Sequence, residues 1–183
     1  SRLGLFATMV ALGQPMIYMG QEFGVERPRN RVDLKWPEFL ENHHYYQWVS
    51  GLIRLRRRYP GLRIYGYDPW QEGTFDWLIG PWLGEKYGRG RNVIGWTTNP
   101  GPEPWERMVV LLNFEPYEVM VDLEFPLPGY WVKLADIDSI NDLPPEGENS
   151  IDHPATIKTT GHFGGFTLPS SSGFIYKWES GLA

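Results

Sequence analysis

Gly13-Gln-Pro-Met-Ile-Tyr-Met-Gly-Gln-Glu-Phe-Gly24 is a short apolar run bounded by glycine and proline. Residues Met16 to Met19 carry no charge, which predicts a strand buried on both of its faces, as in a parallel sheet. Gly20 ends the run, and Gln21 and Glu22 follow it directly. Because α/β barrels carry their chemistry at the carboxyl ends of their strands, we expect these two polar side chains to lie near a binding site.

Helical periodicity lies on both sides of this run. Apolar residues between positions 2 and 12 recur at mixed three- and four-residue spacing, which predicts a mostly buried helix. Residues 36–40 predict a short helical turn, and residues 42–59 predict an amphipathic helix with Asn42 as its cap. Four arginines gather near the end of that helix, where we expect them to offset the helix dipole and to form salt bridges.

The spacing changes after residue 61 from helical to strand-like. Val119, Val121 and Leu123 alternate with other residues, which predicts a half-buried strand. Short strands between glycine, proline and asparagine turns predict an antiparallel sandwich, and the acidic residues 136–154 predict an exposed loop. The predicted strands are Thr74–Ile79, Asn92–Thr97, Met108–Phe114, Glu118–Phe125, Trp131–Ala135, Phe163–Leu168 and Gly173–Trp178.

Length and composition limit the function classes. The 183 residues suit one domain, or one domain with a fragment, and the absence of an initial methionine suggests a piece of a longer protein or a processed product. A net charge of −5 gives no reason to expect nucleic acid or an anionic membrane as partner. The chain has no cysteine, so a disulfide framework or a thiolate metal site is excluded. No apolar run approaches the length of a membrane span.

Five segments together resemble the α-amylase family of glycoside hydrolases, and they keep the family's order along nearly the whole chain. The opening run resembles the signature of the eighth barrel strand. The others resemble the segment after that strand, the last barrel helix and two strands of the C-terminal β-domain: Asp33-Leu-Lys-Trp36, Leu52-Ile-Arg-Leu-Arg-Arg-Arg-Tyr-Pro-Gly-Leu62, Met108-Val-Val-Leu-Leu-Asn-Phe114 and Leu168-Pro-Ser-Ser-Ser-Gly-Phe-Ile-Tyr176.

The resemblance implies a mainly β chain in two parts. Residues 1–60 would be the last helix, strand and helix of a truncated (β/α)8 barrel, and residues 61–183 an antiparallel β-sandwich domain. The nearest subgroup resembles branching enzymes and trehalohydrolases, which favours a cytoplasmic location. The parent enzyme would hydrolyse or transfer α-1,4 or α-1,6 bonds of starch, glycogen or maltooligosaccharides, without a cofactor.

The resemblance also implies that this chain alone is inactive. Family members retain anomeric configuration with a carboxylate nucleophile, a carboxylic general acid/base and a third stabilising aspartate. These residues follow barrel strands that would lie upstream of Ser1, and no residue here matches them. We therefore expect a structural role for this chain. The alternative is a β-sandwich module that binds glucan through exposed tryptophans.

Four residues are the candidates for contact with substrate. Gln21 and Glu22 would lie at the rim of the barrel, although Glu22 has a second interpretation as a structural carboxylate that binds loop amides or an arginine. Among the nine tryptophans, Trp82 and Trp105 have turn-like surroundings that favour exposure, and an exposed indole can stack on a sugar. Most other tryptophans of a sandwich belong to its core.

Other patterns favour structural interpretations. Adjacent histidines such as His43-His44 point about 100° apart on a helix and do not share a ligand face. Asp136, Asp138 and Asp142 suggest calcium, but the glycine and glutamate that a calcium loop requires are missing. The glycine-rich residues 161–166 predict a tight turn or bulge. An uncovered apolar segment at residues 2–19 predicts self-association.

Overall fold

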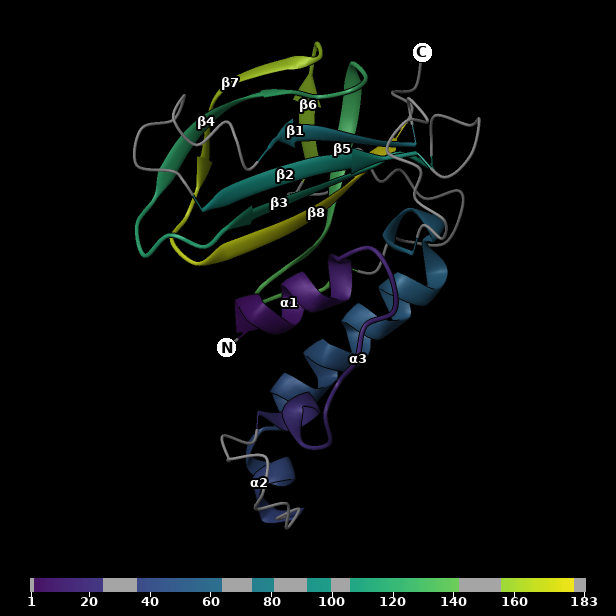
Figure 1. Cartoon of the computed structure of the whole chain (residues 1–183), viewed down its shortest axis with the longest axis vertical. Coiled ribbons are helices and arrows are strands. Elements are labelled where there is room, and N and C mark those ends of the chain that lie inside the picture. Colours follow the sequence, from purple (N-terminus) through teal and green to yellow (C-terminus); the bar gives the residue numbers. More distant parts are fainter. Residues whose placement is uncertain are drawn as a thin grey trace.

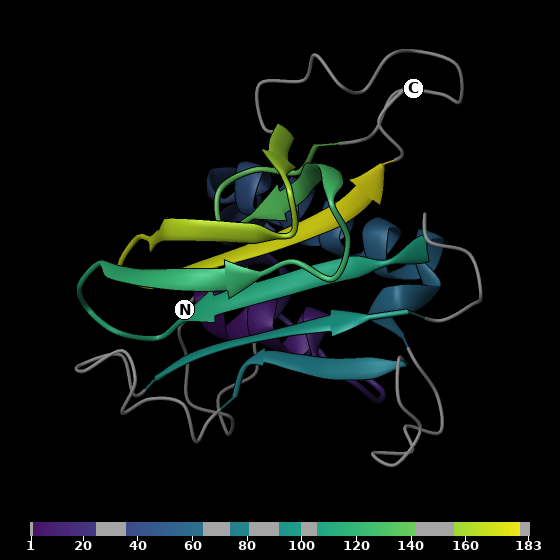
Figure 2. The ribbon, with the colours of Figure 1, turned by 90° about the horizontal axis from the view of Figure 1, so that it is seen from above.

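The fold was determined as a computed structural model that describes residues 2–24, 36–63, 74–80, 92–99, 106–141 and 156–179. It is built in layers (Figure 1). A large antiparallel sheet lies in the middle, a small two-stranded sheet covers one of its faces, and helices lie against the other (Figure 2). Mainly β architecture with a preceding helical part confirms the predicted fold class.

The strands pair in an order that differs from their order in the chain. The six-stranded sheet has the order β1-β2-β3-β8-β5-β6, and β4 pairs with β7 in the second sheet. Every pairing is antiparallel. The strands are β1 (Phe75–Ile79), β2 (Val93–Thr98), β3 (Met108–Asn113), β4 (Val119–Glu124), β5 (Gly129–Asp136), β6 (Thr156–Thr159), β7 (His162–Leu168) and β8 (Ser172–Glu179).

The seven predicted strands are confirmed with small shifts at their ends, and one strand was missed. Strand β6 has only four residues and lies at the edge of the sheet beside β5. A segment that short leaves no alternating pattern long enough to recognise.

Strand β3 is the centre of the packing. All six of its residues are buried, because both faces of the sheet are covered at this strand. Met108, Val110 and Leu112 belong to the hydrophobic cluster shared with the helices. Val109 and Leu111 belong to the second cluster, between the two sheets. The uninterrupted apolar run in the sequence therefore reflects burial on two sides.

Asn113 ends this strand with a fully buried amide. Its Nδ2 donates to the carbonyl oxygens of Tyr117 at 3.0 Å, Leu168 at 3.0 Å and Pro169 at 2.8 Å. Its Oδ1 accepts from the backbone N–H of Glu115 at 2.9 Å. One side chain thus joins the turn after β3 to the turn between β7 and β8, and a buried polar group with its partners satisfied fixes the geometry of both turns.

Strand β4 buries every second residue, as its alternation predicted. Its partner β7 contains Gly164 and Gly165, and the pairing register shifts opposite them, between Val121 and Leu123. Gly165 has a φ of 66°, a conformation that suits glycine. The bulge predicted in the glycine-rich segment is therefore present, although it lies inside a strand.

Three α-helices precede the sheet: α1 (Arg2–Val10), α2 (Trp36–Glu41) and α3 (His43–Arg58). Helix α1 buries Leu5, Phe6, Met9 and Val10. Phe6 stacks on Trp48 of α3 with ring centroids 6.4 Å apart. The apolar face that the sequence left uncovered in α1 is thus covered within the chain, by α3 and the sheet.

Two contacts join the helices to the sheet. The indole Nε1 of Trp48 donates to the carbonyl oxygen of Asp136 on β5 at 3.0 Å. Phe6 lies against Gly173 of β8, where a Cβ atom would stand 2.7 Å from the phenyl Cδ1. One hydrophobic cluster therefore includes residues from both proposed parts of the chain. The division at residue 60 stays a prediction.

The predicted strand at Met16–Met19 is wrong in this structure. Residues 14–18 belong to no helix or strand, and the segment runs beside α3 (Figure 1). Met16 is 74% exposed and Met19 is 50% exposed. A buried parallel strand needs partner strands on its edges and cover on both faces. The described residues place no partner strand beside this segment, and only Ile17 packs against the hydrophobic cluster of the helices.

Substitution of Gly173 by alanine tests the docking of α1 on the sheet. The added methyl group would overlap Phe6, so we expect a loss of about 1–3 kcal/mol in the free energy of unfolding. Gly4→Ala is the matched control, because its Cβ would meet nothing within 4 Å and alanine favours the helix by roughly 0.5–1 kcal/mol. Urea unfolding measures both. A Gly173→Ala chain as stable as the parent would contradict this packing.

Candidate functional site

The two polar residues after Gly20 form a closed turn. Gln21, Glu22 and Phe23 make one 3-10 turn, η1 (Gln21–Phe23), between two glycines in the left-handed region, Gly20 at φ 96° and Gly24 at φ 76°. Phe23 is buried and anchors the turn. Glycine at both ends permits the two sharp changes of direction that reverse the chain here.

The side chains of this turn bind its own backbone. The Oε1 of Gln21 accepts from the N–H of Tyr18 at 2.8 Å, and the Oε2 of Glu22 accepts from the N–H of Gly20 at 2.7 Å. These contacts agree with the structural interpretation of Glu22, as a carboxylate that binds loop amides. The contact of Gln21 and Glu22 with a sugar stays a prediction.

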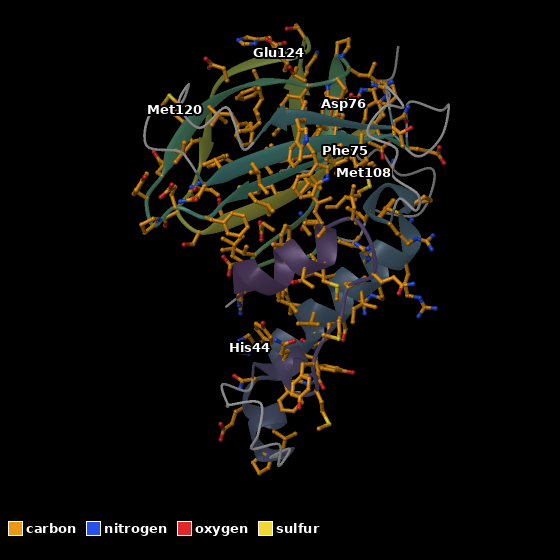
Figure 3. The ribbon with its side chains drawn as sticks, viewed as in Figure 1. His44, Phe75, Asp76, Met108, Met120 and Glu124 are labelled. Carbon is orange, nitrogen blue, oxygen red and sulfur yellow. The ribbon has the colours of Figure 1, made fainter. Side chains whose placement is uncertain are left out.

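The turn lies on the first half of α3, at the end of the molecule farthest from the sheets (Figure 1). Gly24 packs beside the ring of Tyr45. His43 stacks on Tyr46 with ring centroids 6.3 Å apart, and His44 is exposed at the same end (Figure 3). The histidines are therefore surface residues of the first helical turn, as predicted. Several large apolar or aromatic side chains of α2, α3 and the segment before η1 are exposed, namely Met16, Tyr18, Met19, Leu40 and Tyr46.

Trp82 and Trp105 lie outside the described residues. Among the described tryptophans, Trp77 of the edge strand β1 is 38% exposed. It meets Phe75 edge to face at 5.1 Å between centroids, and Trp96 of β2 at 6.2 Å. The three rings form an aromatic cluster at the sheet edge, with Phe75 marked in Figure 3. Trp77 was not among the predicted surface tryptophans, because it lies within a predicted strand rather than in a turn.

The acidic residues at the end of β5 are engaged in a local network. Asp136 accepts from Lys133 Nζ at 2.7 Å and from the backbone N–H groups of Asp138 at 2.9 Å and Ser139 at 2.6 Å. Asp138 pairs with Arg2 at 2.8 Å. These carboxylates thus close a turn and tie it to α1. Asp142, the third of the acidic residues, lies outside the described residues.

This network sets the charge state of Asp136. Burial favours the neutral acid and raises the pKa, but the hydrogen bonds from Lys133, Asp138 and Ser139 and the charge of Lys133 outweigh it, so the pKa of Asp136 lies below its ordinary value. The ionised carboxylate is therefore the form that stabilises the fold.

The arginines near the end of α3 differ in role. Arg54, Arg57 and Arg58 are exposed, whereas Arg56 is buried. The guanidinium of Arg56 donates to carbonyl oxygens at the end of α1. Arg56 thus binds the end of a neighbouring helix, and the dipole role of the arginines on their own helix stays a prediction.

In the part of the chain that the structure describes, three or more histidine or acidic side chains never gather closely enough to hold a metal ion. None of the described helices has the length and apolar character required to cross a membrane.

The chain is similar to branching enzymes in sequence. It is 33% identical over 136 residues to the 1,4-alpha-glucan branching enzyme GlgB of Rhodopseudomonas palustris (strain BisB5), a match that covers 69% of this chain and 17% of that protein. It is 28% identical over 144 residues to the GlgB of Marinobacter nauticus, covering 74% of this chain and 21% of the relative. The chain thus spans about a fifth of the length of these relatives. No family model matches it.

The fold is similar to part of several solved enzymes. A type I pullulanase from Bacillus subtilis, solved with maltose, superposes with a TM-score of 0.67 at 19% identity, over 98% of this chain and 23% of the pullulanase. A debranching enzyme from Nostoc punctiforme gives a TM-score of 0.57 at 19% identity, over 97% of this chain and 30% of that enzyme. At these identities the likeness concerns the fold.

Substitution of Asp136 by asparagine tests the acidic network. We expect a loss of about 1 kcal/mol in unfolding free energy at pH 7, because the charge that Lys133 binds is removed. The folded pKa is depressed, so the contribution is present above the unfolded pKa of about 3.9 and is lost as the pH falls through the folded pKa. The difference from the parent chain should therefore shrink in acid.

Asp138→Asn is the matched control, since its ion pair with Arg2 is largely exposed and contributes about 0.5 kcal/mol or less. Urea unfolding at several pH values measures both variants. An Asp136→Asn deficit that is the same at every pH would contradict the ionised network.

Proposed function

Because this chain belongs to the α-amylase family and matches a part of its relatives' length, we propose that it is the C-terminal structural region of an enzyme that acts on α-glucans. The observation that carries the proposal is the 33% identity to a 1,4-alpha-glucan branching enzyme over 69% of this chain. The superposed pullulanase was solved with maltose, and the other superposed structure is a debranching enzyme. The choice between hydrolysis and transfer lies with catalytic residues expected elsewhere in the parent enzyme.

A structural role is supported by how the candidate site residues are used. The carboxylate of Glu22 accepts a backbone N–H from Gly20, and the amide of Gln21 accepts one from Tyr18. A retaining glycosidase instead needs two carboxyl groups about 5–5.5 Å apart on either side of the scissile bond. We therefore assign Gln21 and Glu22 to shaping the turn, with contact to glucan at the rim of the parent's site.

The exposure of residues 14–19 supports the proposal that further chain of the parent enzyme lies beside this segment. Met16 is 74% exposed and Met19 is 50% exposed, and an exposed apolar surface is stabilised when another surface covers it. In our proposal further chain of the parent enzyme covers this segment. In the separate chain the same surface would favour self-association, which sedimentation velocity measures. A chain that stays monomeric at all concentrations would contradict the predicted self-association.

The first experiment assays the separate chain on amylose. We expect reducing ends and iodine staining to stay at background, because the family's catalytic carboxylates have no counterpart here. The full-length protein encoded by the complete reading frame is assayed in parallel, and it should change either the number of reducing ends or the iodine staining. Turnover by the chain that is lost in Glu22→Gln would make Glu22 catalytic. A complete product inert on amylose, glycogen and maltooligosaccharides would contradict the α-glucan proposal.

A glucan-binding module is the second candidate, favoured by the aromatic cluster of Phe75, Trp77 and Trp96. An exposed indole at a sheet edge offers a flat apolar face, and sugars stack on such faces. The cluster lies on the sandwich, away from the Gln21–Glu22 turn (Figure 3). A binding role would therefore be separate from the parent's catalytic site.

Affinity electrophoresis through gels that contain soluble starch distinguishes the two candidates. For a purely structural region we expect the same mobility with and without starch. Retardation that is lost in Trp77→Ala and kept in Met120→Ala would favour the binding module. Met120 is the matched control because it is an exposed apolar residue of the other sheet, on β4.

A further inference from the structure

Arg56 is a buried guanidinium at the junction of two helices. It lies in the last turn of α3 and is only 6% exposed. Its Nη1 donates to the carbonyl oxygens of Met9 at 2.6 Å and Ala11 at 3.0 Å, and its Nη2 donates to that of Gly13. One side chain thus binds three carbonyl groups along the exit of α1.

Met9 lies in the last turn of α1, and Ala11 and Gly13 lie in the segment that follows the helix. The last carbonyls of a helix have no intrahelical donor, and the dipole places partial negative charge there. A planar guanidinium with several fixed donors can satisfy more than one of them at once, which the single ammonium of lysine cannot do in the same geometry. Gly13, at φ 96°, then turns the chain away from α1.

The segment that follows Gly13 is fixed again at its other end. Gly20 and Phe23 are buried, and η1 packs on α3. Between these anchors, Met16 and Met19 lie largely in solvent. Helix α3 therefore holds both ends of the exposed segment: Arg56 holds the first, and the η1 contact holds the second.

We propose that Arg56 is a positioning residue that sets the path of residues 14–19 and so the placement of the Gln21–Glu22 turn. This rests on the proposed function only in assigning that turn to the rim of a glucan site. The clamp itself is a property of the separate chain. It fixes the path of the exposed segment before any neighbouring chain binds, so that binding does not first have to order it.

Hydrogen exchange of the intact 183-residue chain tests the proposal, with peptides from residues 14–24 compared against peptides from β3. In Arg56→Ala we expect exchange in residues 18–24 to rise about tenfold or more relative to β3, because the backbone hydrogen bonds of η1 open locally. Arg56→Lys should behave like the alanine variant. Arg57→Ala, which removes an exposed arginine of the same turn, should match the parent chain.

Chemical rescue separates positioning from general stability. Guanidinium at low millimolar concentration should restore protection of residues 18–24 in Arg56→Ala, whereas sodium chloride at equal ionic strength should not. Gly173→Ala disturbs α1 at Phe6 and keeps the Arg56 side chain, so guanidinium should not rescue it.

Three outcomes would overturn the proposal: parent-like protection in Arg56→Lys, equal acceleration in β3 and in residues 18–24, or no rescue. The assay contains no glucan and no partner strand. Its result can therefore overturn the role of Arg56 while the proposed function stands, and the proposed function can be overturned while the role of Arg56 stands.

Discussion

The burial of β3 on both faces is the constraint on which the rest of the structure depends. A central strand of six buried residues needs apolar cover from two directions. The pair β4–β7 supplies one cover and helices α1 and α3 supply the other. The helices are therefore part of the core that closes the sandwich, which explains why Phe6 and Trp48 are as deeply buried as the strands they cover.

Local patterns in the sequence predicted most of the sheet. The alternation in β4 indicates burial on one face, and the continuous apolar run of β3 indicates burial on two faces. Both strands were therefore predicted from their patterns. The four-residue β6 carries too little pattern. The apolar run at Met16–Met19 has the composition of a buried strand, but composition cannot supply the neighbours that bury it. Arg56 was expected to serve its own helix, because the chain segment that it binds is distant in sequence.

Local sequence patterns also predicted the turn of the candidate site, but not its contacts with other groups. Gly20 followed by two polar residues indicates a sharp turn, and the hydrogen bonds of Gln21 and Glu22 stay within three residues. Contact with a substrate depends on groups outside such a turn, so spacing alone does not determine it. Trp77 shows the converse: its exposure follows from the edge position of β1, and edge position is a property of topology.

The contact between Phe6 and Gly173 has a consequence for the order of events during synthesis. Strand β8 pairs with both β3 and β5 and receives α1 on its surface, yet it is made after all of them. A nascent chain therefore leaves one edge of β3 unpaired, and the surface of α1 at Phe6 without Gly173, until residue 179 has left the ribosome. Long-range closure of this kind slows folding and leaves time for aggregation or chaperone capture. Translation of the last strand, rather than of the first helix, is the step that commits this chain to its fold.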